Sequence, residues 1–196
     1  MSSPVSTLPR QSLNARQKET VERLFAEAAL LLEEVGHDQL TIRMVASRAG
    51  VSPATAYTYF ASKDHLFAEL FWRLMESDEG AVLDGATPVA RLQQLLRHLA
   101  EMIASAPALA AAVNKSLLSG DPEVERLRLE IGTRWVVLFR EAIGDDVVVD
   151  PDVLTTLSFA VTGALLQAGV GVFTYEALAD HLEAAARVIM ADPTTV

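Results

Sequence analysis

Two helix signals stand close together between Thr41 and Phe60, and their spacing constrains the fold more than any other feature of the chain. Gly50 is expected to end the first helix, because a residue without a Cβ adopts the positive φ angle of a helix end with little steric strain. Ser52 is a good N-cap for a second helix, and Pro53 suits its first position. The turn between the two helices therefore contains about three or four residues, which predicts a helix-turn-helix.

The second of these helices has two chemically different faces. On a helical wheel, Ala56 and Phe60 form the buried side. The outward face carries small or hydroxyl-bearing residues bordered by tyrosines, namely Ala54, Thr55, Tyr57, Thr58 and Tyr59. Such a face can enter the major groove of DNA, whereas a glutamate-rich face would be repelled by phosphate.

The stretch from Thr41 to Leu66 resembles the DNA-binding region of the TetR family, the tetracycline-repressor-like bacterial transcription regulators. The residues that carry the resemblance are Thr41, Val45-Ala46, Ala49-Gly50-Val51-Ser52, Tyr57-Thr58-Tyr59-Phe60, Lys63 and Leu66. The resemblance implies phosphate contacts from Thr41, Ser52, Tyr57, Tyr59 and Lys63. It implies contacts with base edges from Pro53, Ala54, Thr55 and Thr58. Arg43, which projects away from the apolar face of its helix, is a further candidate.

Several of these residues have a second explanation that needs no DNA. Thr41 and Ser52 would cap helices in any protein. Tyr57 and Tyr59 have the alternative of packing against the back of the first helix of the motif. Lys63 is unfavourable in the first turn of a helix, and this favours an external phosphate as its partner.

The charge of the chain is unevenly distributed. The sequence has 16 basic and 26 acidic residues, a formal net charge of −10. Residues 1–75 hold 8 of each sign, so residues 76–196 hold the other 8 basic residues and 18 acidic ones. If residues 1–75 bind DNA, the acidic residues of 76–196 would repel the phosphates and limit non-specific DNA binding.

The rest of the chain reads as helices, with no alternating strand pattern and no internal repeat. We expect an all-α protein of about nine helices. The expected domains are a flexible tail (1–15), a three-helix helix-turn-helix domain (16–62) and a larger ligand-binding and dimerisation domain (63–196). Its last five helices are expected near 88–105, 107–118, 122–143, 151–173 and 175–191. The N-terminus lacks the apolar run of a signal peptide, so a cytoplasmic location is expected.

The segment 153–175 contains no charged residue. Its length alone would suit a membrane span, but the polar residues Thr155, Thr156, Ser158, Thr162 and Gln167 and the lack of flanking Lys or Arg favour a buried helix. Because it is hydrophobic all round, we expect one side to pack in its own subunit and the other against a second subunit. The expected homodimer interface comprises Phe159, Gly163, Leu166, Val170, Phe173, Leu178, Leu182, Ala185 and Ile189.

The resemblance also implies a small-molecule pocket in the C-terminal domain. Residues on inward faces of the central helices are the candidates, with ordinary core packing as the alternative for each. They are Phe71, Trp72, Leu96, Leu99, Met102, Ile103, Val113, Ser116, Leu117, Trp135, Phe139, Ser158 and Thr162. Their composition favours a largely apolar effector such as a lipid, an acyl thioester, a steroid or a hydrophobic drug.

No catalytic or metal-binding pattern is present. The chain has no cysteine, its four histidines are scattered, and it lacks a nucleophile elbow and a phosphate-binding glycine loop. We expect no enzyme activity, no cofactor and no metal. The predicted function is that of a ligand-responsive repressor that binds a palindromic operator as a homodimer. The alternative is a helical, dimeric partner-binding protein that does not bind DNA.

Overall fold

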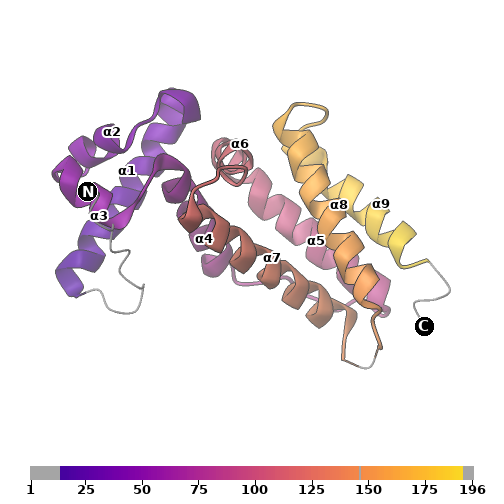
Figure 1. The fold of residues 1–196 in the computed structure, drawn as a ribbon. Helices are drawn as coiled ribbons and strands as arrows, with labels where there is room; N and C mark the ends of the chain where they lie inside the picture. The colour runs from indigo at the N-terminus through magenta and orange to yellow at the C-terminus, as the bar shows by residue number, and fades with distance from the viewer. Residues whose placement is uncertain (1–13, 146, 192–196) are drawn as a thin grey trace. The chain divides into compact units, whose positions relative to one another are not determined.

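The computed structural model describes residues 14–145 and 147–191 (Figure 1). Across these residues the chain forms nine α-helices, one short 3-10 helix and no β-strand, so the predicted all-α fold is confirmed. The predicted tail, 1–15, lies outside the described residues except for its last two. Asn14 caps the first helix, and Ala15 is the first residue of that helix.

The chain divides into two compact units. Unit 1 comprises Met1–Glu76 and Ala111–Arg128, and unit 2 comprises Ser77–Ala110 and Leu129–Val196. This division differs from the boundary predicted after residue 62. The fourth helix belongs with the N-terminal helices because its residue Phe67 is fully buried against α1. The ring centroids of Phe67 and His37 are 5.2 Å apart.

Unit 1 contains the four N-terminal helices, except for the last residue of the fourth. They are α1 (Ala15–Gln39), α2 (Ile42–Arg48), α3 (Pro53–Tyr59) and α4 (Lys63–Ser77). Asn14 and Gln17 form a capping box that starts α1, and Gly36 interrupts its helical backbone with a φ of 72°. The rings of Phe25 and Phe60 meet edge to face at 5.1 Å. This aromatic contact joins α1 to the end of α3 in the core of unit 1.

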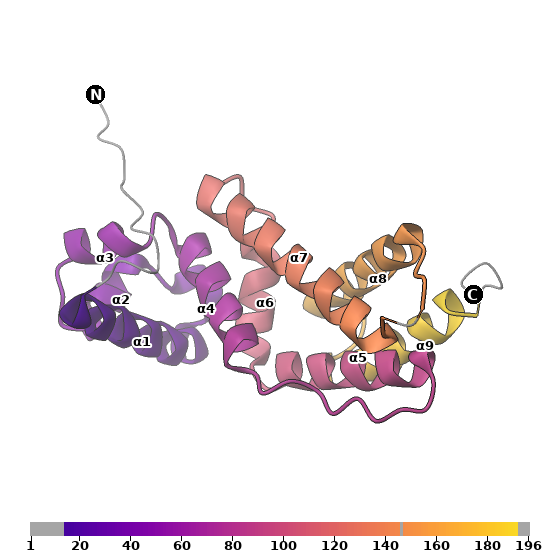
Figure 2. The ribbon, with the colours of Figure 1, turned by 90° about the horizontal axis from the view of Figure 1, so that it is seen from below.

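The remaining helices begin with proline or at a short 3-10 turn. They are α5 (Pro88–Ala104), α6 (Pro107–Ser116), α7 (Pro122–Ile143), α8 (Pro151–Gly169) and α9 (Leu178–Ile189), the last preceded by the 3-10 helix Tyr175–Ala177. Helices α6 and α7 contribute residues to both units. Within unit 2, α9 packs on both α5 and α8 (Figures 1 and 2).

Helix α8 is shorter than the sequence predicts. It ends at Gly169, and Gly171 adopts a φ of 80°, which reverses the chain before α9. A left-handed glycine at this point ends the helix earlier than its apolar pattern suggests. None of the described helices combines the length and the apolar character needed to cross a membrane.

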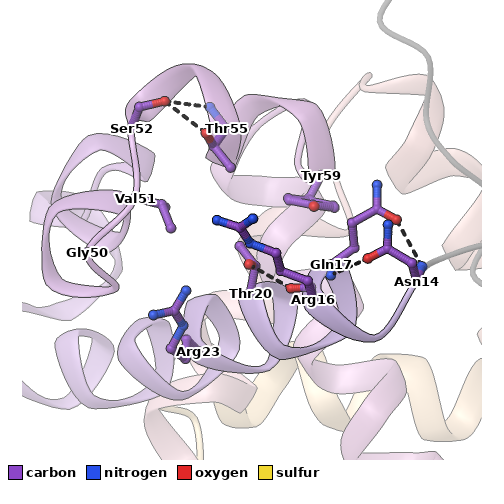
Figure 3. Close-up of a pocket in the computed structure, with 10 residues that line it drawn as sticks. All are labelled: Asn14, Arg16, Gln17, Thr20, Arg23, Gly50, Val51, Ser52, Thr55 and Tyr59. Atoms are coloured by element: carbon purple, nitrogen blue, oxygen red, sulfur yellow. Dashed lines mark hydrogen bonds between the residues drawn. The ribbon is translucent and has the colours of Figure 1, made fainter.

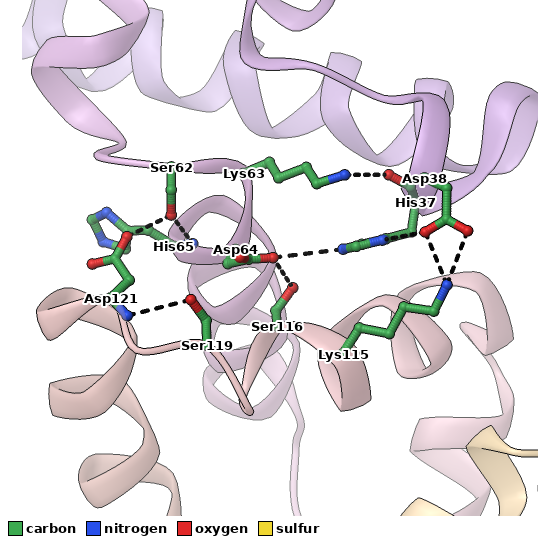
Figure 4. Close-up of polar contacts among 10 residues, drawn as sticks. All are labelled: His37, Asp38, Ser62, Lys63, Asp64, His65, Lys115, Ser116, Ser119 and Asp121. Atoms are coloured by element: carbon green, nitrogen blue, oxygen red, sulfur yellow. Dashed lines mark hydrogen bonds and ion pairs between the residues drawn. The ribbon is translucent and has the colours of Figure 1, made fainter.

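Polar contacts join the start of α4 to the α6–α7 connection inside unit 1 (Figure 4). The Ser116 hydroxyl is fully buried and donates to Oδ1 of Asp64 at 3.0 Å. The Ser62 hydroxyl donates to the Asp121 carboxylate. Near the end of α1, Nζ of Lys115 donates to Oδ1 of Asp38 at 2.9 Å. These side chains connect segments that are more than fifty residues apart in the sequence.

The Asp38–Lys115 contact predicts a pH dependence of stability. Hydrogen bonds from Lys115 and His37 lower the pKa of Asp38 from its usual 3.8 to about 2. Because the folded state holds the ionised carboxylate more strongly than the unfolded state does, the contribution is present above pH about 4 and is lost as the pH falls towards 2. Asp38→Asn should therefore lower the melting temperature at pH 7, and the difference from wild type should shrink to zero near pH 2.

Thermal denaturation followed by circular dichroism between pH 2 and pH 7 measures this difference. Asp145→Asn, which removes the same charge at an exposed turn, is the matched control. A difference between wild type and Asp38→Asn that stays constant over this range would contradict the prediction.

Candidate nucleic-acid interface

The turn between α2 and α3 is closed by main-chain hydrogen bonds. The N–H of Val51 donates to the carbonyl of Ala46 at 3.0 Å, and the N–H of Gly50 donates to that of Ser47 at 3.2 Å. This pair of bonds is a Schellman motif, and it places Gly50 in the left-handed region with a φ of 68°. The motif ends α2 and sets the direction in which α3 begins.

Hydroxyl side chains cap both helices of the motif. Oγ1 of Thr41 accepts from the N–H of Met44 at 3.2 Å, and Oγ of Ser52 accepts from the N–H of Thr55 at 3.1 Å. The capping roles that the sequence suggested for Thr41 and Ser52 are therefore confirmed. Both residues remain exposed, so their hydroxyls are also accessible from solvent.

The two faces of α3 are divided as predicted. Ala56 is fully buried and Phe60 is nearly so, whereas Pro53, Ala54 and Thr58 are exposed. The Thr58 hydroxyl donates to the carbonyl of Ala54 at 3.0 Å, which holds the side chain along the helix surface. The outward face of α3 is therefore small, uncharged and open to solvent.

The remaining predicted contacts of the motif differ in exposure. Tyr57 is 42% exposed, whereas Thr55 and Tyr59 are half-buried. Lys63 is also half-buried, and its Nζ donates to the carbonyl of His37 at 3.0 Å. This bond gives Lys63 a partner within unit 1. Arg43 is exposed on α2.

Helix α1 places further polar residues beside the predicted contacts of the helix-turn-helix. Arg16, Thr20 and Arg23 line a cleft together with Ser52, Thr55 and Tyr59 of the α2–α3 region (Figure 3). The spacing of residues 16, 20 and 23 places them on one face of a helix, and this was the available sequence signal. Only the packing of α1 beside α3 shows that this face meets the predicted DNA contacts.

The predicted effector-pocket residues do not all lie in the protein interior. In unit 2, the buried members are Leu96, Leu99, Met102, Ile103, Trp135 and Phe139. Ser158 is half-buried, and its hydroxyl donates to the carbonyl of Leu154. Thr162 is exposed on the outer side of α8, so its assignment to an inward face is wrong.

The other predicted pocket residues belong to unit 1. Phe71, Val113 and Ser116 are buried there, whereas Trp72 and Leu117 are half-buried. The hydroxyl of Ser116 already donates to Asp64. Ser116 therefore has a structural role at the start of α4.

The predicted dimer interface divides into exposed and buried residues. On α8, Phe159, Leu166 and Val170 are 72%, 46% and 69% exposed. Gly163, Phe173, Ala185 and Ile189 are half-buried. Leu178 and Leu182 are 0% and 2% exposed, because α9 packs with this side on α5 and α8. These two leucines belong to the interior of one protomer, and we remove them from the expected interface.

A second cleft lies beside this exposed stripe, wholly within unit 2. Its volume is about 460 Å³, and it is lined by Phe159, Ala160, Gly163, Ala164, Gln167, Val172, Phe173 and His181. The ring centroids of Phe173 and His181 are 4.2 Å apart. In the part of the chain that the structure describes, no cluster of three His, Asp or Glu side chains is arranged to hold a metal ion.

Comparison with known proteins relates this architecture to one family. A sequence profile described as "Bacterial regulatory proteins, tetR family" matches residues 24–70, which include α2 and α3. An uncharacterized HTH-type transcriptional regulator of Mycobacterium bovis is 41% identical over 190 residues, covering 94% of this chain and 88% of that protein. The HTH-type transcriptional repressor KstR of Rhodococcus jostii is 28% identical over 143 residues, which are 71% of this chain and 68% of KstR.

A solved structure extends the similarity to the fold. FadR of Thermus thermophilus, a TetR family transcriptional repressor in complex with lauroyl-CoA, aligns with a TM-score of 0.66 at 24% identity. The alignment covers 87% of this chain and 93% of FadR. Because the sequence match spans nearly the whole chain and the family profile falls on the helix-turn-helix, this chain belongs to the TetR family of bacterial transcriptional regulators.

Proposed function

We propose that this regulator is a homodimeric repressor that reads a palindromic operator through α3 and leaves it when a small, largely apolar effector binds among its C-terminal helices. The observation that carries the proposal is the outward face of α3. Pro53, Ala54 and Thr58 are exposed on this face, and the opposite side of the helix is buried through Ala56 and Phe60. The similarity to the repressor KstR supports the direction of regulation.

Base recognition follows from the chemistry of this face. The major groove admits a helix only if its side chains are short enough for the helix to approach the base edges. A threonine hydroxyl can donate to or accept from a base edge, and a threonine or alanine methyl can contact the methyl group of thymine. Thr58, Thr55 and Ala54 offer these groups, while Thr41 and Tyr57 offer hydroxyls for backbone phosphates.

Dimerisation is proposed from the outer side of α8. Phe159, Leu166 and Val170 form a stripe of exposed apolar side chains at helical spacing. A stripe of this kind marks an interaction surface, and a second copy of the chain would cover it by self-complementary contact. Two reading helices held in this way would meet half-sites about 34 to 36 Å apart, or a multiple of that distance, on a palindrome.

The effector is proposed to be apolar because the helices of unit 2 enclose mainly apolar side chains. Leu96, Met102 and Trp135 are representative of this interior. FadR of Thermus thermophilus, which shares the fold, binds lauroyl-CoA, a ligand with a long apolar chain. To release the operator, an effector must favour the non-binding state by about 1 to 3 kcal/mol or more.

The exposed threonine of α3 provides a direct test of DNA binding. Thr58→Asp should weaken operator binding about 10- to 100-fold, because it removes the base contact of the threonine and adds a carboxylate that repels phosphate. The melting temperature should stay within a few degrees of wild type, since the side chain is exposed. Fluorescence anisotropy with an operator duplex and thermal denaturation measure the two effects.

Thr133→Asp is the matched control for this change. Thr133 is also exposed, and its hydroxyl also donates to the carbonyl four residues earlier, that of Leu129 on α7. The control should bind operator as wild type does. Equal loss of binding in both variants, or a large loss of stability in Thr58→Asp, would show that α3 does not present this face to DNA.

The apolar stripe on α8 provides a test of the dimer. Leu166→Arg should produce monomers in sedimentation velocity at micromolar concentration, because it places a charge in an apolar interface. Operator affinity should fall with it, since two half-sites would then be bound independently. Leu129→Arg, at another exposed leucine of unit 2, should remain dimeric. A dimer that persists in Leu166→Arg would place the interface elsewhere.

A further inference from the structure

The cleft beside α3 is basic although the chain as a whole is acidic. Its volume is about 370 Å³. The lining residues are Asn14, Arg16, Gln17, Thr20, Arg23, Gly50, Val51, Ser52, Thr55 and Tyr59. Two of them are arginines and none is Asp or Glu, whereas the whole chain has a formal net charge of −10. The cleft therefore has the charge and the hydroxyl donors that suit an anion.

The two arginines of the cleft differ from most other basic residues of unit 1. Carboxylates bind Arg48, Arg73, Lys115 and Arg126, and main-chain carbonyls bind Lys63 and Arg128. Among the described residues, the ion pairs with carboxylates involve other basic side chains, and neither Arg16 nor Arg23 belongs to one. Their guanidinium groups are thus available to an external anion, while most of the remaining positive charge is already used in holding the unit together.

A capping box orders the start of α1, where Arg16 lies. Oδ1 of Asn14 accepts from the N–H of Gln17 at 3.0 Å, and Oε1 of Gln17 accepts from the N–H of Asn14 at 2.9 Å. This reciprocal cap orders the first turn of α1, which contains Arg16. In Figure 3, the guanidinium groups of Arg16 and Arg23 point from α1 towards the segment that joins α2 and α3.

The cleft is continuous with the proposed DNA-reading face. Ser52, Thr55 and Tyr59 line it, and each is also a predicted contact of the helix-turn-helix. A duplex whose base edges meet the outward face of α3 carries its sugar-phosphate backbone past the ends and sides of that helix. The cleft is therefore placed to meet backbone phosphates beside the bases that α3 reads.

We propose that Arg16 and Arg23 of α1 bind backbone phosphates of the operator in this cleft and so set the register of α3 in the major groove. This inference rests on the proposed DNA-binding function and adds a second helix to the contacting surface. Guanidinium groups suit phosphate because they offer parallel N–H donors to its oxygens. Contacts of this kind position a protein on DNA without reading its sequence.

Salt dependence tests the proposal. The operator is the duplex that the wild-type protein selects from a random pool, and affinity is measured by anisotropy from about 50 to 300 mM KCl. The double variant Arg16→Gln/Arg23→Gln should bind on the order of tenfold more weakly. Its plot of log K against log salt should be shallower by about 0.9 for each lost phosphate contact. The loss should be similar for non-specific DNA.

Lys18→Gln is the matched control because Lys18 is an exposed basic residue of α1 that does not line the cleft. It should keep the wild-type slope, and Arg23→Lys should keep most of it because the charge is retained. Both arginines are exposed, so the circular dichroism spectrum and the melting temperature of the double variant should match those of wild type.

Each other outcome overturns the inference in a recognisable way. If the double variant binds with the slope and affinity of Lys18→Gln, α1 does not hold phosphate, although the proposed function stands. If the loss is confined to the selected operator and spares non-specific DNA, the arginines contact bases and not the backbone. If wild type shows no salt-sensitive binding to any duplex, the proposed function and this inference fail together.

Discussion

The direction in which α3 leaves the α2–α3 turn is the constraint on which the proposed function depends. Val51 donates to the carbonyl of Ala46 across the turn, and Gly50 supplies the left-handed backbone that makes this bond possible. Ala46 and Ala56 are both fully buried, so the two helices can pack closely. Since successive residues of a helix are rotated by a fixed angle, this packing also decides which side chains of α3 face outward.

The polar side chains of unit 1 show how an acidic protein can have a surface suited to DNA. Arg48 on α2 is held by Glu27 and Glu34 of α1, and its guanidinium lowers the pKa of the Glu34 carboxyl by donating hydrogen bonds to it. Such pairs remove positive charge from the free surface and attach α2 to α1. The charge that stays unpaired among the described residues then matters more, because Arg16 and Arg23 lie together beside α3. Net charge alone would have argued against a polyanionic partner.

In unit 2, one apolar face of the segment 153–175 is buried and the other is exposed. Leu154, Leu157 and Val161 of α8 are buried within the protomer, whereas Phe159, Leu166 and Val170 are exposed. The expected interface residues Phe159, Leu166 and Val170 are thus exposed. A helical wheel did not show that α9 turns its leucines inward onto α5 and α8, because a wheel describes one helix and contains no information on its neighbours. For the same reason Thr162 was placed on an inward face although it is exposed.

Local chemistry along the chain determined the helices, their caps and the helix-turn-helix. Asn14, Thr41, Ser52 and Asp150 all act as N-caps in the structure, since a cap needs only a hydrogen bond to a main-chain N–H two or three residues away. Contacts between distant segments were decided by tertiary packing alone. These include the inclusion of α4 in unit 1 and the cleft formed by α1 and the α2–α3 region, because the free energy of such contacts depends on residues that no sequence window brings together.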